Sequence, residues 1–322
     1  MSKITNLIGN TPMIKIEYEI EGKIKSLYAK LEYYNLTGSI KDRTAYYIIK
    51  DAIDQKILKD GMPILEATSG NTGISLAALG SYYKHPVYIY MPDWMSIERR
   101  NLIKSFGANV ILISKAEGGV AGGAIKAKKK AEELNGFVAN QFENKSNFKA
   151  HYETTGKEIL EQIPEKIYAL VAGVGTGGTL MGAGMRIREK INDVKLVAVE
   201  PENSPVISQG KVLGGHKIEG IGAGFLPDLV DKSAISQTEL IKDDDALNMS
   251  KKLAKELGLG VGISSGANIM GAILLQNKVN QPVVTVFPDD NKKYLSTELM
   301  NDINKNEDLI SNKVKLIGYK EV

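Results

Sequence analysis

The sequence predicts an α/β protein with two doubly wound domains, mostly parallel sheets and a ligand-binding cleft between the domains. Three observations predict this fold. Short β-branched runs alternate with longer helical patterns, this alternation occurs twice along the chain, and two glycine-rich loops directly follow predicted strands. Open α/β sheets bind ligands beyond the carboxyl ends of their strands, so both loops should face a crevice.

Six short apolar runs are predicted strands. They are almost continuously apolar, as expected when helices cover both faces of a parallel sheet. The predicted strands are residues 64–67, 87–91, 109–113, 167–171, 195–199 and 283–287. Helical patterns lie around them at residues 41–57, 72–84, 96–106, 121–135, 148–162, 178–191, 243–257 and 265–278. This order favours parallel strands joined by right-handed crossovers.

The chain is long enough for two hydrophobic cores, with 322 residues and 43% hydrophobic content. The strand–helix rhythm runs over one segment before about residue 140 and resumes at about residue 147. We therefore expect a smaller, mobile domain formed by residues 35–145. Residues 1–34 together with residues 146–322 should form the larger domain.

The composition excludes several classes of function. A net charge of +3 from 41 basic and 38 acidic residues gives no basic stripe for nucleic acid. The absence of cysteine excludes disulfides and thiolate chemistry, and three widely separated histidines make a metal site an unfavourable interpretation. We find no secretory segment in residues 1–6 and no apolar run of about 18 residues, so we expect a cytoplasmic protein without a membrane span.

The loop at residues 173–179 follows a predicted strand and opens a helix. Its glycines Gly173, Gly175 and Gly178 match a dinucleotide-binding pattern, and Glu200 ends the next strand as that pattern requires. A nicotinamide dehydrogenase is therefore one interpretation, and a plain strand-to-helix turn is another. Backbone N–H groups at a helix start bind any phosphate, and the threonine hydroxyls suit a compact phosphate monoester.

A second loop, residues 68–73, also follows a strand and opens a helix. Its hydroxyl, amide and backbone N–H groups can converge on one carboxylate. Ordinary helix N-capping is the alternative, but it accounts for only one of the four polar side chains. Lys41 follows a short turn and opens an apolar-periodic segment, where a cleft could hold it. One amine and two anion-binding loops together indicate a phosphorylated cofactor and an acidic substrate.

Nine motifs in order resemble the fold-type II pyridoxal-phosphate enzymes, specifically the cysteine synthase (O-acetylserine sulfhydrylase) and cystathionine β-synthase family. The resemblance covers about residues 4–300, and the ordered set is far more specific than any single motif. The motifs are residues 8–12, 38–43, 68–73, 91–92 with 98–100, 141–144, 154–159, 175–179, 219–225 and 262–267. The resemblance implies a fold similar to the tryptophan synthase β chain, with pyridoxal 5′-phosphate in the cleft.

The resemblance also implies a role for each matching residue. Lys41 would form the Schiff base with the cofactor and act as general base. Asn71 would hydrogen-bond the ring hydroxyl of the cofactor and contact the substrate. Ser264 would face the pyridine nitrogen, where a neutral hydroxyl suits β-replacement better than transamination. The phosphate would be held by Gly175, Thr176, Gly177, Gly178 and Thr179. The substrate would be held by Thr68, Ser69, Thr72, Gln141, Gly222 and Ala223.

The implied reaction is β-replacement on a β-substituted L-alanine. O-acetylserine plus sulfide, giving cysteine and acetate, is the leading substrate pair. The alternative is an enzyme of the lanthionine synthase or cystathionine β-synthase type, which activates cysteine or serine and releases sulfide or water. The resemblance further implies a homodimer, and some relatives dock the C-terminus of a serine acetyltransferase. A catalytically silent binding module with the same fold is a second alternative.

The sequence departs from the family pattern at three places. Leu36 stands where many members have proline, Trp94 lies in the altered segment 93–95, and residues 290–293 read Asp-Asn-Lys-Lys. None of these positions is a proposed cofactor residue. The departures therefore leave the reaction class in place and the identity of donor and acceptor open.

Overall fold

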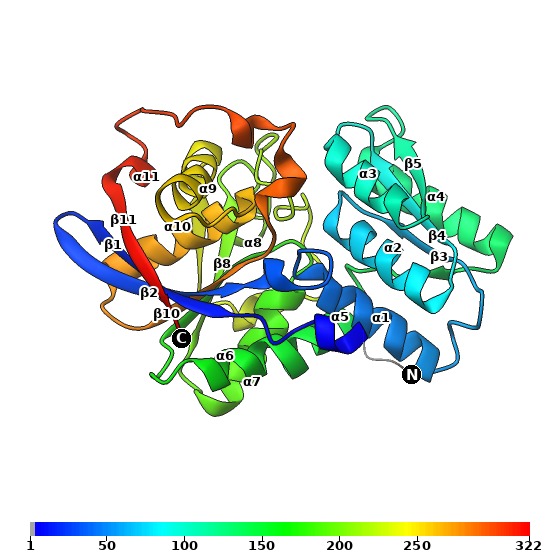
Figure 1. Ribbon diagram of the computed structural model, residues 1–322, viewed down its shortest axis with the longest axis horizontal. Coiled ribbons are helices and arrows are strands. Elements are labelled where there is room, and N and C mark those ends of the chain that lie inside the picture. Colours follow the sequence, from blue (N-terminus) through cyan, green and yellow to red (C-terminus); the bar gives the residue numbers. More distant parts are fainter. Residues whose placement is uncertain (1–3) are drawn as a thin grey trace.

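Two sheets divide the chain into two units (Figure 1). The computed structural model describes residues 4–322. The smaller sheet has four parallel strands in the order β5-β4-β3-β6, and the larger has seven in the order β11-β1-β2-β10-β7-β8-β9. Strands β2, β10, β7, β8 and β9 are parallel to one another. The prediction of an α/β fold with mostly parallel sheets is confirmed.

All six predicted strands are present, with small differences in their bounds. They are β3 (Ile64–Ala67), β4 (Val87–Pro92), β5 (Asn109–Ile113), β7 (Ala169–Gly173), β8 (Lys195–Pro201) and β10 (Val283–Phe287). Strand β7 begins two residues later than predicted, because its pairing with β10 starts where Ala169 lies opposite Val283.

Five further strands were not predicted. They are β1 (Met13–Ile20), β2 (Lys23–Leu31), β6 (Phe137–Val138), β9 (Gln237–Ile241) and β11 (Val314–Glu321). Strands β11, β1 and β2 are antiparallel and form one edge of the larger sheet. Glu21 and Gly22 join β1 to β2 with φ angles of 51° and 72°, as a tight two-residue hairpin requires.

The helices follow the predicted pattern closely. They are α1 (Lys41–Asp54), α2 (Asn71–Tyr83), α3 (Ile97–Ser105), α4 (Gly119–Leu134), α5 (Lys145–Ala150), α6 (Gly156–Gln162), α7 (Gly184–Lys190), α8 (Val206–Gln209), α9 (Asp243–Leu257), α10 (Ile263–Lys278) and α11 (Ile310–Lys313). One wider turn, η3 (His151–Thr155), joins α5 to α6, and another, η4 (Thr179–Ala183), precedes α7. Short 3₁₀ turns are η1 (Ile4–Leu7), η2 (Glu32–Tyr34), η5 (Lys232–Ala234), η6 (Asn291–Tyr294) and η7 (Glu298–Met300).

Local chemistry explains several helix ends. Helix α9 starts with three aspartates, whose charges favour the positive end of the helix dipole, and it stops at Gly258, where φ is 72°. Asn144 caps α5 because its Oδ1 accepts a hydrogen bond of 3.0 Å from the Ser146 N–H. Asn135 ends α4 in the left-handed region, which asparagine tolerates better than most residues.

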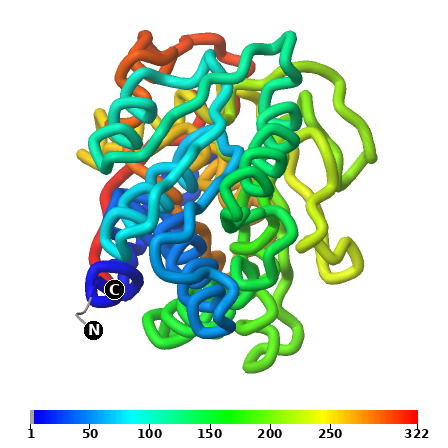
Figure 2. The backbone as a smooth tube through the Cα atoms, turned by 90° about the vertical axis from the view of Figure 1, so that its right-hand side faces the viewer, coloured from blue at the N-terminus to red at the C-terminus, as the bar shows by residue number. Residues whose placement is uncertain are grey.

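Helices cover both faces of each sheet. Helices α9 and α10 pack on one face of the larger sheet and α6 and α7 on the other (Figure 1). In the smaller unit, α4 packs on one face, and α1, α2 and α3 pack on the opposite side. Helix α1 also lies beside α5 (Figure 2), so the segment that begins at Lys41 contacts both units. No helix among residues 4–322 is both long and apolar enough to cross a bilayer.

Candidate active site

A cavity of about 550 Å³ lies between the two units, and a smaller pocket adjoins it. Both loops singled out from the sequence line the large cavity, together with α3, the first turns of α4 and the segment 219–228. Further lining residues were not predicted as site residues: Arg99, Val120, Ala121, Ala124, Ile125, Phe142, Glu143, Glu219, Phe225, Asp228 and Tyr294. Lys41, Asn71, Gly175 and Thr176 line both spaces, which joins them into one site.

Most residues singled out from the sequence lie on these two surfaces. The large cavity is lined by Lys41, Thr68, Ser69, Asn71, Thr72, Gln141, Gly175, Thr176 and Ala223. The smaller pocket adds Gly177, Thr179 and Ser264. Gly178 and Gly222 line neither space. The N–H of Gly222 donates to the Val174 carbonyl at 3.0 Å, so this glycine ties the 219–225 segment to the end of β7.

Lys41 is the first residue of α1 and lies where the cavity meets the smaller pocket. Burial of its amino group lowers the pKa to about 8, while the negative charge of Asp289 opposes that shift. At pH 7 about a tenth of this amine is therefore uncharged and nucleophilic, far more than for a lysine with the ordinary pKa of 10.5.

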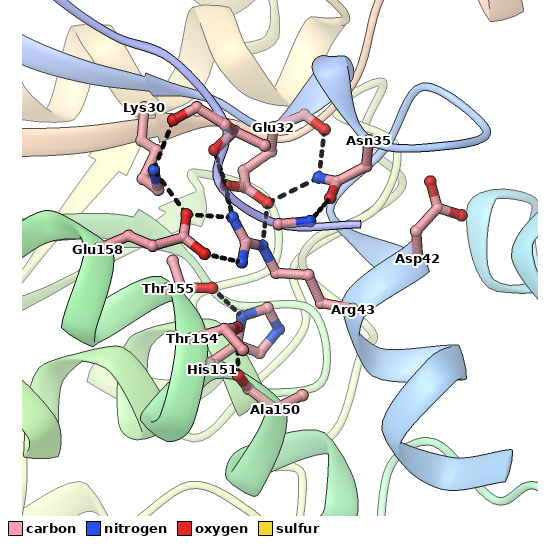
Figure 3. Close-up of polar contacts among 12 residues, drawn as sticks. Lys30, Glu32, Asn35, Asp42, Arg43, Ala150, His151, Thr154, Thr155 and Glu158 are labelled. Carbon is pink, nitrogen blue, oxygen red and sulfur yellow. Dashed lines mark hydrogen bonds and ion pairs between the residues drawn. The ribbon is translucent and has the colours of Figure 1, made fainter. Parts of the chain in front are cut away.

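A buried ionic cluster fixes the start of α1 (Figure 3). The Arg43 guanidinium donates to Glu32 at 2.7 Å and to Glu158 at 2.6 Å, and Lys30 pairs with Glu158 at 2.8 Å. Lys30 also donates to the Thr11 carbonyl at 2.9 Å. Two cations balance two anions, and their hydrogen bonds offset the cost of burial. The cluster joins β2, α1 and α6, so the residue two positions after Lys41 is rigidly held.

The loop at 68–73 connects β3 to α2. The hydroxyl of Thr72 donates to the Gln141 side-chain oxygen at 2.6 Å, and the Gly70 N–H donates to the Thr68 hydroxyl at 3.2 Å. Helix α2 has no side-chain N-cap bond, so the capping interpretation does not account for these polar residues. A side chain at Gly70 would overlap that of Arg99, which explains a glycine here.

The loop at 173–179 connects β7 to η4. The amide of Asn147 donates to the Thr176 hydroxyl at 2.8 Å, and His151 Nε2 lies 3.3 Å from the Thr179 hydroxyl. A Cβ atom at Gly175 would overlap the Gly220 carbonyl oxygen, so only glycine permits this approach of the two loops. Neighbours from α5 and η3 thus hold the two threonines of the loop.

Glu200 does not face this loop as a ribose-binding carboxylate would. Its two oxygens accept hydrogen bonds from the N–H groups of Ile207 at 2.6 Å and Ser208 at 3.0 Å, and the side chain is buried. Glu200 therefore holds the start of α8. The acid that completes the dinucleotide pattern in the sequence therefore binds backbone N–H groups of its own chain instead of a ribose. This removes the main support for a dehydrogenase.

An ion pair between Arg99 and Glu219 crosses the cavity. Arg99 comes from α3 in the smaller unit, and Glu219 from the segment after α8 in the larger one. Sequence spacing offers no signal for this pair, because the partners are separated by 120 positions. Trp94, in contrast, does not line the cavity. It packs against Gly119, at the start of the helix whose first turns do.

Comparison with known proteins decides the family. The family model described as pyridoxal-phosphate dependent enzyme matches residues 4–289. The chain belongs to this family. Cysteine synthase of Staphylococcus aureus (strain Mu50) is 42% identical over 302 residues, which cover 93% of this chain and 97% of that protein. Cysteine synthase B of Campylobacter jejuni is 43% identical over 300 residues, covering 92% and 98%.

Among solved structures, a hydrogen sulfide-producing enzyme from Fusobacterium nucleatum is 48% identical. The alignment covers 99% of this chain and 98% of that one, with a TM-score of 0.94. The chain is therefore a pyridoxal-phosphate dependent enzyme with the fold-type II architecture, as the resemblance implied. The dehydrogenase and the silent module are not supported.

The residues of the site fit the cofactor. Lys41 supplies an amine of lowered pKa, and the 175–179 loop supplies closely packed backbone and two hydroxyls at the start of a helical turn. The side-chain oxygen of Asn71 is buried and has no hydrogen-bond partner among residues 4–322, so it is available to a ligand. Over the same residues, no group of histidines and carboxylates could hold a metal ion.

Proposed function

We propose that the protein catalyses β-replacement on a β-substituted L-alanine, with O-acetyl-L-serine and sulfide as the leading substrates and L-cysteine and acetate as products. One observation carries this proposal. Lys41, whose pKa is lowered to about 8, lies in a cavity lined by two loops. The 173–179 loop suits a phosphate, and the 68–73 loop suits a carboxylate. The relatives named cysteine synthase support the choice of substrates.

In the proposed site, Gly175, Thr176, Gly177, Gly178 and Thr179 would hold the phosphate, and Asn71 and Ser264 would hold the ring. Thr68, Ser69, Thr72 and Gln141 would bind the substrate carboxylate and Ala223 would also contact the substrate, while Gly222 would act by holding the 219–225 segment in place. Pyridoxal phosphate, when bound, withdraws electrons from the α-carbon of the amino acid. The chain supplies the binding, the orientation and the proton transfers.

Lys41 is the general base in this proposal. Its Nζ takes the α-proton of the substrate and later returns a proton to the same carbon. An amine with a pKa of about 8 can do both near neutral pH, because its two protonation states are close in free energy. By binding the substrate carboxylate, the 68–73 loop would turn the α-proton toward Lys41. The Arg99–Glu219 pair, which crosses the cavity, would limit the entry of water.

A second candidate uses L-cysteine as donor and releases hydrogen sulfide. The 48% identical structure of a hydrogen sulfide-producing enzyme from Fusobacterium nucleatum favours it. The cavity also extends beyond the carboxylate loop to the apolar first turns of α4 and to Asp228, whose carboxylate is exposed there. That space would admit a second amino acid as acceptor.

The experiment that separates the two donors measures both products. Purified protein is given O-acetylserine plus sulfide, and cysteine formation is followed; a parallel sample receives cysteine plus a second thiol, and sulfide release is followed. We expect kcat/KM to be at least about tenfold higher for O-acetylserine, a difference of about 1.4 kcal/mol in transition-state binding. A preference of that size for cysteine would establish the second candidate instead.

Four further properties belong to this proposal. Residues 35–145 would move as a unit against residues 1–34 and 146–322 when the carboxylate loop binds substrate. The chain would form a homodimer, which light scattering on the purified protein tests, and a serine acetyltransferase C-terminus would compete with substrate for the cavity. A cytoplasmic location stays a prediction that cell fractionation tests.

A further inference from the structure

We propose that Asp289 is a positioning residue that fixes the side-chain amide of Asn71, and so determines which amide atoms meet the cofactor ring. The inference rests on the proposed place of the ring beside Asn71 and is independent of the donor. It concerns a residue that lines neither cavity and has no role in the reaction described above.

The backbone around Asp289 is tied to the site on two sides. Asp289 follows β10 and Pro288, whose carbonyl accepts a hydrogen bond of 2.8 Å from the N–H of Ile40, directly before Lys41. The carbonyl of Asp289 accepts from the Gly262 N–H at 2.9 Å, at the start of α10. The carboxylate therefore has a fixed place relative to both Lys41 and Ser264.

The side chain of Asp289 is fully buried, and one of its oxygens makes two hydrogen bonds. Oδ2 accepts from Asn71 Nδ2 at 2.8 Å and from the Tyr294 hydroxyl at 2.7 Å. A Cβ atom at Gly262 would overlap Oδ1, so the chain leaves room for this carboxylate. Arg99, Lys293 and Lys41 act on it electrostatically, but no ion pair to Asp289 is present in the described chain.

The chemistry of this contact decides the orientation of the amide. An ionised carboxylate oxygen only accepts hydrogen bonds, so Oδ2 of Asp289 faces the NH₂ end of Asn71. The Asn71 oxygen then points away from Asp289 and is buried with no hydrogen-bond partner within residues 4–322. A residue able to donate as well as accept would leave the amide free to flip.

The test uses the holoenzyme and the Asp289→Asn variant, which keeps the shape and adds a donor. The readout is the ratio of the two tautomeric absorption bands of the bound cofactor, because that ratio reports hydrogen bonding at the ring oxygen. We expect Asp289→Asn to change this band ratio about threefold and to speed cofactor loss about tenfold. In an Asn71→Ala background, the same substitution should change neither quantity appreciably. Asp290→Asn is the matched control, since this neighbouring carboxylate pairs with Lys293 and not with Asn71.

The outcomes separate this inference from the proposed function. An equal effect of Asp289→Asn in both backgrounds, or no effect in either, overturns the role of Asp289. An Asn71→Ala variant with an unchanged spectrum overturns the proposed place of the ring as well. If Asp289→Asn does not fold, Asp289→Ser makes the same comparison, because serine is smaller and can also donate. A protein with no cofactor band at all contradicts the proposed function itself.

Discussion

The guanidinium of Arg99 lies over the ring of Tyr294, with the guanidinium carbon 4.4 Å from the ring centre. Arg99 belongs to the smaller unit and Tyr294 to the larger, so this cation–π contact joins them across the cavity. The same guanidinium pairs with Glu219, and the Tyr294 hydroxyl donates to Asp289. A continuous set of contacts therefore runs from α3 to Asn71.

Removing the charge of Glu219 should weaken this connection. We expect Glu219→Gln to raise the donor KM about tenfold with a smaller effect on kcat, because the units then close less firmly on bound substrate. Steady-state kinetics measure this. The exposed Lys50–Asp54 pair supplies the control, since Asp54→Asn should leave KM unchanged. An unchanged KM in Glu219→Gln would show that the ion pair does not assist closure.

The lowered pKa of Lys41 predicts a pH dependence in the cofactor-free protein. The rate of cofactor attachment should rise with pH through a midpoint of about 8, because only the neutral amine attacks. Absorbance after rapid mixing measures this rate. A midpoint near 10.5, the ordinary value for lysine, would contradict the burial of the amine.

The same shift predicts how stability changes with pH. Between pH 8 and 10.5 the unfolded chain binds more protons at Lys41 than the folded chain does, so the free energy of unfolding rises with pH over that window. Thermal melts of the cofactor-free wild type and Lys41→Met should diverge there, because the variant lacks the part of the rise in unfolding free energy that comes from Lys41. Parallel melting curves would count against the predicted shift.

Breaking the buried cluster should destabilise the fold. We expect Glu158→Gln to lower the free energy of unfolding by about 3–5 kcal/mol, because Arg43 and Lys30 lose a shared buried partner. Urea titration measures this. Glu161→Gln, in an exposed pair with Lys157, should change it by less than about 0.5 kcal/mol. Equal effects of the two variants would mean that the buried cluster stabilises the fold no more than an exposed ion pair does.

Acid should weaken the same cluster. Despite burial, the Arg43 and Lys30 charges hold the pKa of Glu158 at about 2, below its ordinary value of 4.5. Its contribution is therefore complete above about pH 4.5 and is lost as the pH falls toward 2. Melting curves of the wild type should converge on those of Glu158→Gln over this range. A constant difference down to pH 2 would contradict the shift.

The close approach at Gly175 predicts a loss of cofactor affinity on substitution. Gly175→Ala should weaken binding of pyridoxal phosphate at least about tenfold, because the added methyl pushes the loop away from Gly220. Gly214→Ala is the control, since nothing lies within 4 Å of a Cβ there. Equilibrium dialysis measures both. An unchanged affinity in Gly175→Ala would remove the loop from the cofactor site.

The central strands could be predicted from the sequence because they are uninterrupted apolar runs. Strand β10 was placed to the residue, and β3 likewise. Strands β1 and β2 were missed because charged residues interrupt their apolar positions. Their signal was the alternation in residues 13–20, where Ile14, Ile16, Tyr18 and Ile20 are buried, followed by a Glu-Gly turn. Strand β6 has two residues and gives no periodic signal.

The candidate site was predictable where a loop follows a strand, since such loops meet at one edge of a sheet. Arg99 and Glu219 lie in two of the family motifs, 98–100 and 219–225, but their meeting with Tyr294 at one cavity depends on tertiary packing, which no local pattern encodes. Asp289 had a usable signal, because it follows the carboxyl end of β10 in the way that the 173–179 loop follows β7. Its contact with Asn71, 218 positions away, required the structure.

Locating the covalent bond to the cofactor tests directly whether Lys41 forms the Schiff base. The purified protein is reduced with borohydride and digested, and the peptides are analysed by mass spectrometry. We expect a pyridoxyl group on Lys41 and on no other lysine. A pyridoxyl group on a different lysine, or no modified peptide after saturation with pyridoxal phosphate, would contradict this expectation.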